Sequence, residues 1–341
     1  MPSRRRRQVS MADVAQAAGV SAQTVSRVSN GYEGVVPETR ERVIAAMRQL
    51  GYRPNAAARA LKRGSFHNIG VVMFDLTTTG NTSTLAAISE SASAYGYTVT
   101  LLSPQTRTSA SVSGAFDRLH ELLVDGVILI MESMPDDPEG TSFTLPDVDH
   151  LVVVDSALGS NQAVVDTDQA AGTRSAVEHL LALGHQTVHH ITGPAHSYSA
   201  QRREKAWREV LTEAGRRIPE PAHGDWSAAS GYQAARALLE DPTCTAIFCG
   251  NDEMSLGLLH AAQDLGRRVP EDLSVVGFDD IPLAADFAPP LTTVHQDFAG
   301  MGRACMARLV RMMSTGVAEI GQELVPTSLI VRASTAAPRP R

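Results

Sequence analysis

Short apolar runs alternate with helical patterns along residues 65–336, and this alternation restricts the fold more than any other feature of the sequence. Runs that predict buried parallel strands occur at 68–74, 98–102, 126–130, 150–154, 188–192, 245–249 and 274–278. Helical patterns lie between the later runs, at 171–184, 201–215 and 252–266. Alternating strands and helices form parallel sheets with helices on both faces. A chain of 341 residues is too long for a single hydrophobic core, so more than one lobe is expected. The predicted fold class is α/β, with two doubly wound lobes in series.

A small all-helical head precedes these lobes. Apolar residues recur at helical spacing through residues 11–30, at Val14, Ala15, Ala18, Val25 and Val28. Between the two predicted helices, Gly19 can adopt the left-handed conformation that ends a helix, and Ser21 is a good N-cap. A third amphipathic helix is predicted from Pro37 to Gly51.

The exposed face of the second helix carries small and hydrogen-bonding side chains, which are Ala22, Gln23, Ser26, Arg27 and Asn30. A helix-turn-helix needs this pattern because its second helix enters the major groove while its back face packs on the first helix. Residues 1–64 hold 12 Lys and Arg against 4 Asp and Glu, whereas the other 277 residues hold 18 against 33. A basic head on an acidic body is typical of a polyanion-binding module, and with the helix-turn-helix pattern the expected partner is double-stranded DNA. For Arg4–Arg7 we favour a solvated tail over added phosphate contacts.

Residues 54–64 form a short alanine-rich segment after the head. Asn55 is an N-cap for a helix that ends at Leu61, and about eight residues are too few for a stable isolated helix. The segment is either a plain linker or a hinge helix that folds on DNA, with Leu61 as a minor-groove wedge. The expected domains are the head (1–53), the hinge (54–64), the two-lobed core (65–336) and a tail (337–341).

Polar side chains follow the predicted strands of the core. They are Asp155, Asn251, Asp252, Asp279 and Asp280, with Arg203 in a first helical turn and Trp226 in a loop. Carboxylates, amides and guanidinium groups make paired hydrogen bonds to adjacent hydroxyls, and an aromatic ring stacks on a sugar. For Asp252 and Asp280 we favour a helix-cap or turn role. Arg203, Trp226 and Asp279 are candidates for holding a ligand in a cleft between the lobes, a role that is favoured mainly by a family resemblance.

Four segments of the head and hinge resemble the LacI/GalR family of bacterial regulators: DVAQAAGVS (13–21), QTVSRV (23–28), TRERV (39–43) and RPNAAARAL (53–61). The resemblance continues from about Val9 to about Ala336, through HLLALGHQ, GDWSAASGYQ, GNDEMSLG, SVVGFDD and PPLTTVHQDF. It implies lobes of the periplasmic-binding-protein type between which the chain crosses three times, with residues near 295–325 returning to the first lobe.

The resemblance also implies roles for individual residues. It assigns base reading to Ala22, Gln23 and Arg27, and minor-groove insertion to Leu61. Positions that dock on the DNA backbone or support the hinge are Asn30, Tyr52, Asn55 and Ala58. Effector contacts are Asp155, Arg203, Trp226, Asn251, Asp279 and Gln296, with Phe298 lining the pocket.

Two departures from the family pattern leave the effector open. The run 126–130 continues into MESMP, where the family's namesake has an asparagine. The residues of the pocket wall near Phe74, Leu76 and Thr78 also differ from those of the namesake. We expect a repressor that a small sugar or a glycoside, such as a galactoside, releases from a palindromic operator. The alternative within the family is a regulator that a purine or another metabolite activates as corepressor. In the family's namesake a leucine-heptad helix joins dimers into tetramers. Residues 334–341 are too short for such a helix and contain proline and arginine, so the comparison implies a homodimer held through the core lobes.

Other functional classes fit the sequence less well. The nucleotide-binding and nucleophile motifs GxGxxG, GxxxxGK[ST] and GxSxG are absent, so neither an enzyme nor a cofactor is expected. A sugar-binding transport protein would share the core but needs a signal sequence in place of the basic head. The spacing of His185 and His189 does not predict a metal site, and Cys244, Cys249 and Cys305 are expected to be buried thiols. No run of 18 apolar residues predicts a membrane span, and a cytoplasmic location is expected.

Overall fold

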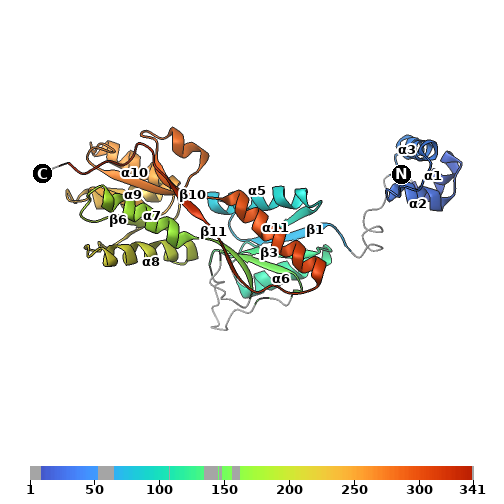
Figure 1. The fold of residues 1–341 in the computed structure, drawn as a ribbon, viewed down its shortest axis with the longest axis horizontal. Helices are drawn as coiled ribbons and strands as arrows, with labels where there is room; N and C mark the ends of the chain where they lie inside the picture. Colours follow the sequence, from blue (N-terminus) through green and yellow to red (C-terminus); the bar gives the residue numbers. More distant parts are fainter. Residues whose placement is uncertain are drawn as a thin grey trace, which may run out of the picture. The chain divides into compact units, whose positions relative to one another are not determined.

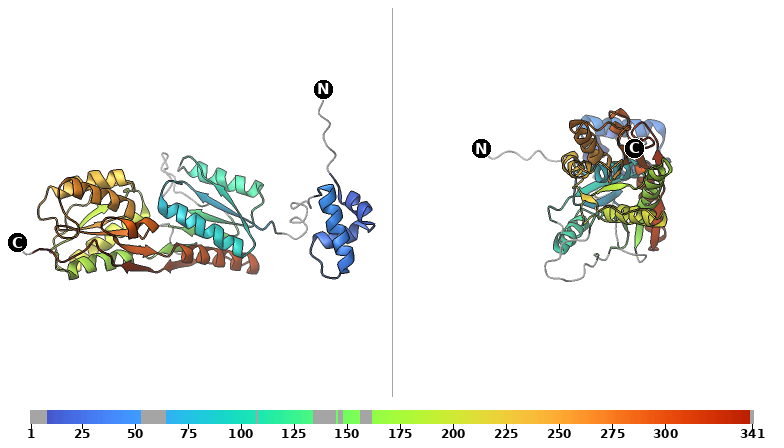
Figure 2. Two further views of the ribbon diagram at one scale, coloured as in Figure 1. Left: turned by 90° about the horizontal axis from the view of Figure 1, so that it is seen from above. Right: turned by 90° about the vertical axis from the view of Figure 1, so that its left-hand side faces the viewer.

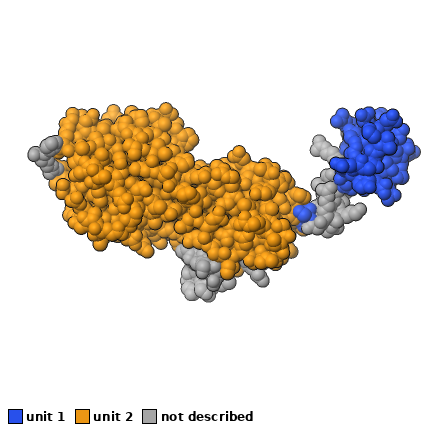
Figure 3. All heavy atoms as spheres, viewed as in Figure 1, with its two compact units in different colours: residues 1–66 blue, residues 67–341 orange. Residues whose placement is uncertain are grey.

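The computed structural model describes residues 9–52, 65–106, 108–133, 145, 148–155 and 162–339. The chain divides into two compact units, Met1–Phe66 and His67–Arg341 (Figure 3). The predicted hinge helix at 54–64 and the Arg4–Arg7 tail lie outside the described residues. Within the described part of the chain, no helix has both the length and the apolar character needed to cross a membrane.

The first unit is a three-helix head. Its helices are α1 (Met11–Ala18), α2 (Ala22–Ser29) and α3 (Pro37–Leu50). The helix end and the N-cap predicted from the sequence are both present. Gly19 ends α1 in the left-handed conformation with φ 65°, and the Ser21 side chain accepts a hydrogen bond from the backbone N–H of Thr24 at 3.1 Å. Val14 and Val25 are fully buried in the shared core.

The first lobe of the second unit is built on a six-stranded parallel sheet in the order β11-β5-β4-β3-β1-β2. Its strands are β1 (Asn68–Met73), β2 (Thr98–Leu102), β3 (Gly126–Ile130), β4 (Leu151–Val154), β5 (Ala163–Thr167) and β11 (Gly321–Val325). Its helices are α5 (Thr79–Ala94), α6 (Ser109–Glu121) and α11 (Phe298–Thr315). Alternate strand residues divide between the faces: Ile128 packs with α5 and α11, and Leu129 packs with α6.

The second lobe repeats this plan, with the strand order β12-β10-β9-β8-β6-β7. Its strands are β6 (His189–Thr192), β7 (Ala222–His223), β8 (Ala246–Cys249), β9 (Ser274–Asp279), β10 (Thr292–Gln296) and β12 (Thr327–Ile330). Its helices are α7 (Gln169–Ala182), α8 (Tyr198–Glu213), α9 (Ala228–Leu239), α10 (Asp252–Asp264) and the 3-10 helix η1 (Pro282–Asp286). Helices α9 and α10 cover one face and α7 and α8 the other, while β12 pairs antiparallel with β10 at one edge.

The chain passes between the lobes three times. The passages join β5 to α7, β10 to α11, and β11 to β12, and they agree with the topology that the resemblance implies. After the second passage, α11 lies along α5 in the first lobe (Figures 1 and 2). Three covalent connections at one junction mean that the lobes can rotate but cannot separate far.

Close packing of α5 against α11 depends on Gly302. A Cβ added at Gly302 would lie 2.4 Å from the backbone carbon of Ala87, which no side-chain adjustment relieves. We expect Gly302→Ala to lower the free energy of unfolding by about 1–3 kcal/mol, because the two helices must move apart. Gly114 in α6 is the matched control, since a Cβ there meets nothing within 4 Å. Gly114→Ala should stabilise the protein by up to about 1 kcal/mol. Urea unfolding measures both, and equal stability of Gly302→Ala and wild type would contradict this packing.

Candidate functional site

The parallel strands of both lobes end at one cavity of about 70 Å³. Residues from the first lobe that line it include Thr79, Asn81, Glu132, Asp155, Asp166, Phe298 and Met301. Residues from α7 onward in the second lobe include Gln169, Ser199, Arg203, Trp226, Asn251, Asp279 and Gln296. All seven effector residues predicted from the sequence therefore lie around a single cavity.

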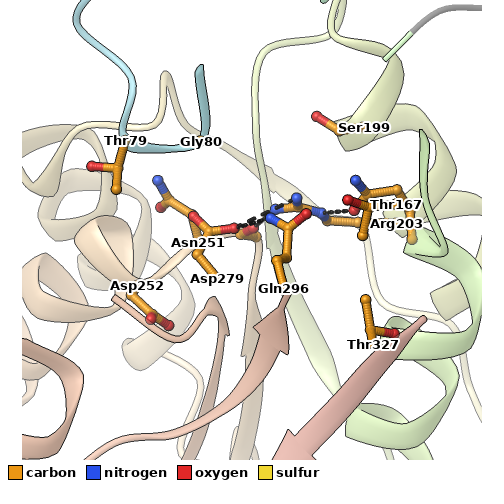
Figure 4. Close-up of polar contacts among 12 residues, drawn as sticks. Thr79, Gly80, Thr167, Ser199, Arg203, Asn251, Asp252, Asp279, Gln296 and Thr327 are labelled. Carbon is orange, nitrogen blue, oxygen red and sulfur yellow. Dashed lines mark hydrogen bonds and ion pairs between the residues drawn. The ribbon is translucent and has the colours of Figure 1, made fainter. Parts of the chain in front are cut away.

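The guanidinium of Arg203, a buried residue of α8, lines this cavity. Its Nε donates to Gln169 Oε1 at 2.8 Å, its Nη1 donates to the Gly250 carbonyl, and its Nη2 lies 3.6 Å from Asp279 Oδ1. The guanidinium carbon also stacks over Phe278, 3.7 Å from the ring centroid. Figure 4 shows Arg203, Asp279, Gln296 and Asn251 converging from different elements of the second lobe. This planar, buried cation is fixed before any ligand arrives.

Asp279 ends β9 and is 5% exposed. Its Oδ1 accepts a hydrogen bond from Gln296 Nε2 at 2.6 Å. Burial raises the pKa of Asp279 to about 7, against the opposing pull of the Arg203 charge. The carboxyl can therefore donate or accept a hydrogen bond near neutral pH.

Trp226 and Glu132 connect the two lobes across the cavity. Trp226 Nε1 donates to Glu132 Oε1 at 3.0 Å, and Asn81 Nδ2 donates to Glu132 Oε2 at 3.3 Å. The indole lies so close to Gly193 that a Cβ there would be 2.2 Å from the ring. The sequence analysis did not predict Glu132 as a site residue, and noted only that its segment lacks the asparagine of the family's namesake. The signal that could have found it is the one that predicted the other strand-end residues, a polar residue that follows a buried apolar run.

Asp155 and Asp166 bring two further carboxyls to the first-lobe wall. Asp166 is 1% exposed within β5 and accepts a hydrogen bond from Arg202 Nη1, and the same nitrogen lies 3.7 Å from Asp155 Oδ1. Burial, with the nearby Asp166 charge, raises the pKa of Asp155 well above its usual value. Burial also raises the pKa of Asp166, while Arg202 opposes that rise. Asp166 and Arg202 were not predicted as site residues, because the strand that holds Asp166 was not recognised.

Three cavity residues that are not glycine adopt left-handed backbone conformations. They are Asp155 with φ 50°, Trp226 with φ 74° and Asp279 with φ 112°. Each such conformation costs on the order of 1–3 kcal/mol and persists only where the surrounding structure imposes it. Three of the six described non-glycine residues with positive φ therefore line this cavity, which is compatible with a binding role for these side chains.

The remaining strand-end residues have structural partners. Asn251 is the N-cap of α10, and its amide donates to the Trp226 carbonyl at 3.0 Å while it lines the cavity. Asp252 is not a cap but the first residue of α10, where it accepts a hydrogen bond from Thr293 Oγ1 at 2.5 Å. Asp280 pairs with Arg332 at 2.6 Å. Neither Asp252 nor Asp280 lines the cavity.

The predicted DNA-facing residues of the head lie on one surface of α2. Ala22, Gln23, Arg27 and Asn30 are exposed, Ser26 is half-buried, and Asn30 Nδ2 donates to Ser26 Oγ at 3.3 Å. Val25 and Val28 on the opposite side pack into the head core. Tyr52 also packs against that core. Asn55, Ala58 and Leu61 lie outside the described residues.

His185 and His189, which the sequence did not predict as a metal site, are buried, and so are the three cysteines. His185 contacts Thr245 Oγ1 and Ser274 Oγ at 3.0 Å each. Among the described residues, no group of three or more His, Cys, Asp and Glu side chains is arranged to hold a metal ion. All three cysteines are free and buried, as predicted.

Comparison with known proteins agrees with this architecture. Residues 10–55 match the bacterial regulatory proteins of the lacI family, and residues 177–335 match a periplasmic binding protein-like domain. The lactose operon repressor of Escherichia coli (strain K12) is 36% identical over 331 residues, which cover 97% of this chain and 91% of that protein.

Two solved structures extend the comparison to three dimensions. The crystal structure of the lac repressor dimer bound to operator and the anti-inducer ONPF has a TM-score of 0.85 at 34% identity, covering 97% of this chain and all of that one. A complex of the transcriptional regulator CelR with cellobiose has a TM-score of 0.69 at 31% identity, covering 96% of this chain and all of that one. The predicted fold class, a helical head followed by two parallel-sheet lobes, is confirmed.

The raised pKa of Asp279 makes stability depend on pH. Between about pH 4 and 7 the folded protein holds a proton that the unfolded chain has released, so ionisation of Asp279 lowers the free energy of unfolding as the pH rises through this range. The amide that replaces this carboxyl in the variant Asp279→Asn cannot titrate. Between pH 5 and 7 the stability of the variant relative to wild type should therefore rise by on the order of 2 kcal/mol, measured by denaturant unfolding. A difference that is constant with pH would show that this carboxyl has an ordinary pKa.

Proposed function

The chain belongs to the lacI family of bacterial regulatory proteins, and on that premise we propose that it is a repressor released from a palindromic operator by a small sugar or glycoside. The observation that carries this proposal is the cavity between the lobes, with Arg203, Asp279 and Trp226 in its wall. Guanidinium, carboxyl and indole groups match a ligand with adjacent hydroxyls and an apolar ring face. The sugar complex of the similar regulator CelR supports this class of ligand.

The head supplies the DNA-binding surface. The exposed side of α2 presents Gln23 and Arg27, whose amide and guanidinium groups suit hydrogen bonding to base edges in the major groove. One helix-turn-helix reads few base pairs, so we propose a homodimer that binds two symmetric half-sites. The lac repressor, similar in sequence and structure, is a dimer on its operator in the crystal. We propose further that the chain acts on DNA in the cytoplasm and has no enzymatic activity, as expected for a relative of transcriptional repressors.

Ligand entry must change the arrangement of the lobes. A cavity of about 70 Å³ holds a few water molecules, whereas pockets for small organic ligands have about 300–1,000 Å³. The hydrogen bonds from Trp226 to Glu132 and from Thr79 to Glu253 both cross between the lobes and close this space. A sugar that replaces these bonds favours a different lobe arrangement, and it shifts DNA binding only by its differential affinity for the two arrangements.

The hinge at 54–64 is the proposed link between the lobes and the DNA. The hinge helix predicted from the sequence has about eight residues, too few to be stable alone, and we propose that movement of the first lobe removes the support that it receives from DNA or from a partner hinge. A 100-fold loss of operator affinity corresponds to about 2.7 kcal/mol of coupling between the two sites.

A pair of variants separates the two activities. Gln23→Ala should weaken binding to a palindromic site, selected by the wild-type protein from random duplexes, by about 1–3 kcal/mol, and leave sugar binding unchanged. Asp279→Asn should bind that site normally but fail to release it when lactose, methyl β-galactoside or cellobiose is added. Each variant is the control for the other, with DNA binding measured by fluorescence anisotropy and sugar binding by calorimetry. If a purine tightens wild-type binding and none of the sugars weakens it, the chain is a corepressed regulator instead.

A further inference from the structure

The cavity has more carboxyl groups than cations to balance them. Four acidic side chains line it, Glu132, Asp155, Asp166 and Asp279, and among the described residues Arg203 is the only lining cation. Arg202 stands behind the wall, paired with Asp166. With these two arginines counted, the charge of the cavity is still negative when all four carboxyls are ionised.

Both arginines are engaged with specific partners. Arg203 contacts Asp279, Gln169 and the Gly250 carbonyl in the second lobe. Arg202 donates to Asp166 and forms an ion pair with Asp155 Oδ1 at 3.7 Å, a separation too long for a hydrogen bond. The charge imbalance is therefore concentrated on the first-lobe wall.

Asp155 provides a second, independent observation. Its Oδ1 is buried and has no hydrogen-bond partner among the residues that the structure describes. An acceptor buried in this way is costly unless a donor reaches it, and Asp155 lines the ligand cavity. Glu132, on the neighbouring strand end, accepts hydrogen bonds from the neutral N–H groups of Trp226 and Asn81, so it too presents acceptors and no donor to the cavity when ionised.

We propose that the effector carries a protonated amine, as an amino sugar or an aminated glycoside does, and that this amine binds at Asp155 and Glu132; the inference rests on the proposed function of the cavity as the effector site. An ammonium group brings three donors and a positive charge, so it satisfies Asp155 Oδ1 and relieves the repulsion between neighbouring carboxylates. A hydroxyl brings one donor and leaves that repulsion in place. The hydroxyls of the same ligand then face Arg203 and Asp279, and its ring faces Trp226.

Protonation of the carboxyls is another way to reduce the repulsion between neighbouring carboxylates. Burial raises the pKa of Asp155 and of Asp279, so these two groups are more readily protonated when no cation is bound. Charges that face Asp155 come from three elements: Asp166 in β5, Arg202 and Arg203 in α8, and Glu132 after β3. An ammonium bound among these groups favours their ionised forms, and this gain is available only to a cationic ligand.

Matched ligand pairs test the proposal. The pairs are galactosamine with galactose, glucosamine with glucose, and 2-aminoethyl β-galactoside with 2-hydroxyethyl β-galactoside, titrated into the full-length protein at pH 6.5, where the amines are protonated. At least one amine should bind tenfold or more tightly than its hydroxyl partner and should release operator DNA at lower concentration. In Asp155→Asn and Glu132→Gln the amine-to-hydroxyl ratio should fall several-fold. Asp272→Asn, which changes a carboxyl at the surface paired with Arg268, should keep the wild-type ratio.

The outcomes separate this inference from the proposed function. Hydroxyl sugars that bind and release DNA as well as their amine partners overturn the amine inference and leave the sugar-responsive repressor in place. An amine preference that persists in both Asp155→Asn and Glu132→Gln also overturns it, since the charge would then be recognised elsewhere. If no member of any pair changes operator binding, both the inference and the sugar effector are wrong. Because the ratio is read within each protein, a variant that is merely less stable does not mimic the expected result.

Discussion

The buried guanidinium of Arg203 joins the core of the second lobe to the ligand cavity. Its partners come from the start of α7, the loop after β8 and the end of β9, so one side chain fixes the relative positions of three elements. A buried charge is tolerated only when it is paired and hydrogen-bonded, and Asp279, Gln169, the Gly250 carbonyl and the Phe278 ring supply those contacts. The same geometry presents hydrogen-bonding groups to the cavity without further rearrangement. Folding of the lobe and preparation of the site are therefore one event.

The three chain passages between the lobes limit how the lobes can move around this cavity. Both lobes supply residues to the wall, with more from the first lobe, and the hydrogen bond between Trp226 and Glu132 spans the gap between them. A ligand that replaces such contacts acts on both lobes at once, while the covalent passages confine the response to rotation. On the proposed function, a ligand bound in this small cavity favours one arrangement of the two lobes over another, which is what an effector site in a regulator requires.

Sequence reasoning located the head, the strand ends and five of the cavity residues from local signals, whereas Gln296 and Phe298 were expected only from the family resemblance. Ser21 caps α2 through its side-chain oxygen and Gly19 ends α1 in the left-handed conformation, and polar residues after apolar strands share one edge of a parallel sheet. It did not find Asp166 and Arg202, whose pairing exists only in the folded protein. It also missed α5 and α9, whose many Ala and Ser residues weaken the helical periodicity, and the edge strands β11 and β12. The three passages between the lobes were expected only from the family resemblance, because no local pattern encodes a return to an earlier lobe.

Coupling between the cavity and the DNA is the central claim, and thermodynamic reciprocity tests it most directly. If the sugar weakens operator binding by some factor, operator DNA must weaken sugar binding by the same factor. The measurement is a titration of the inducing sugar into the free protein and into the protein saturated with its operator, with the dissociation constants compared. The account predicts weaker sugar binding to the operator complex, by the factor found for operator release. Equal affinity of the two forms for the sugar would contradict it, and would mean that the cavity does not control the DNA-binding head.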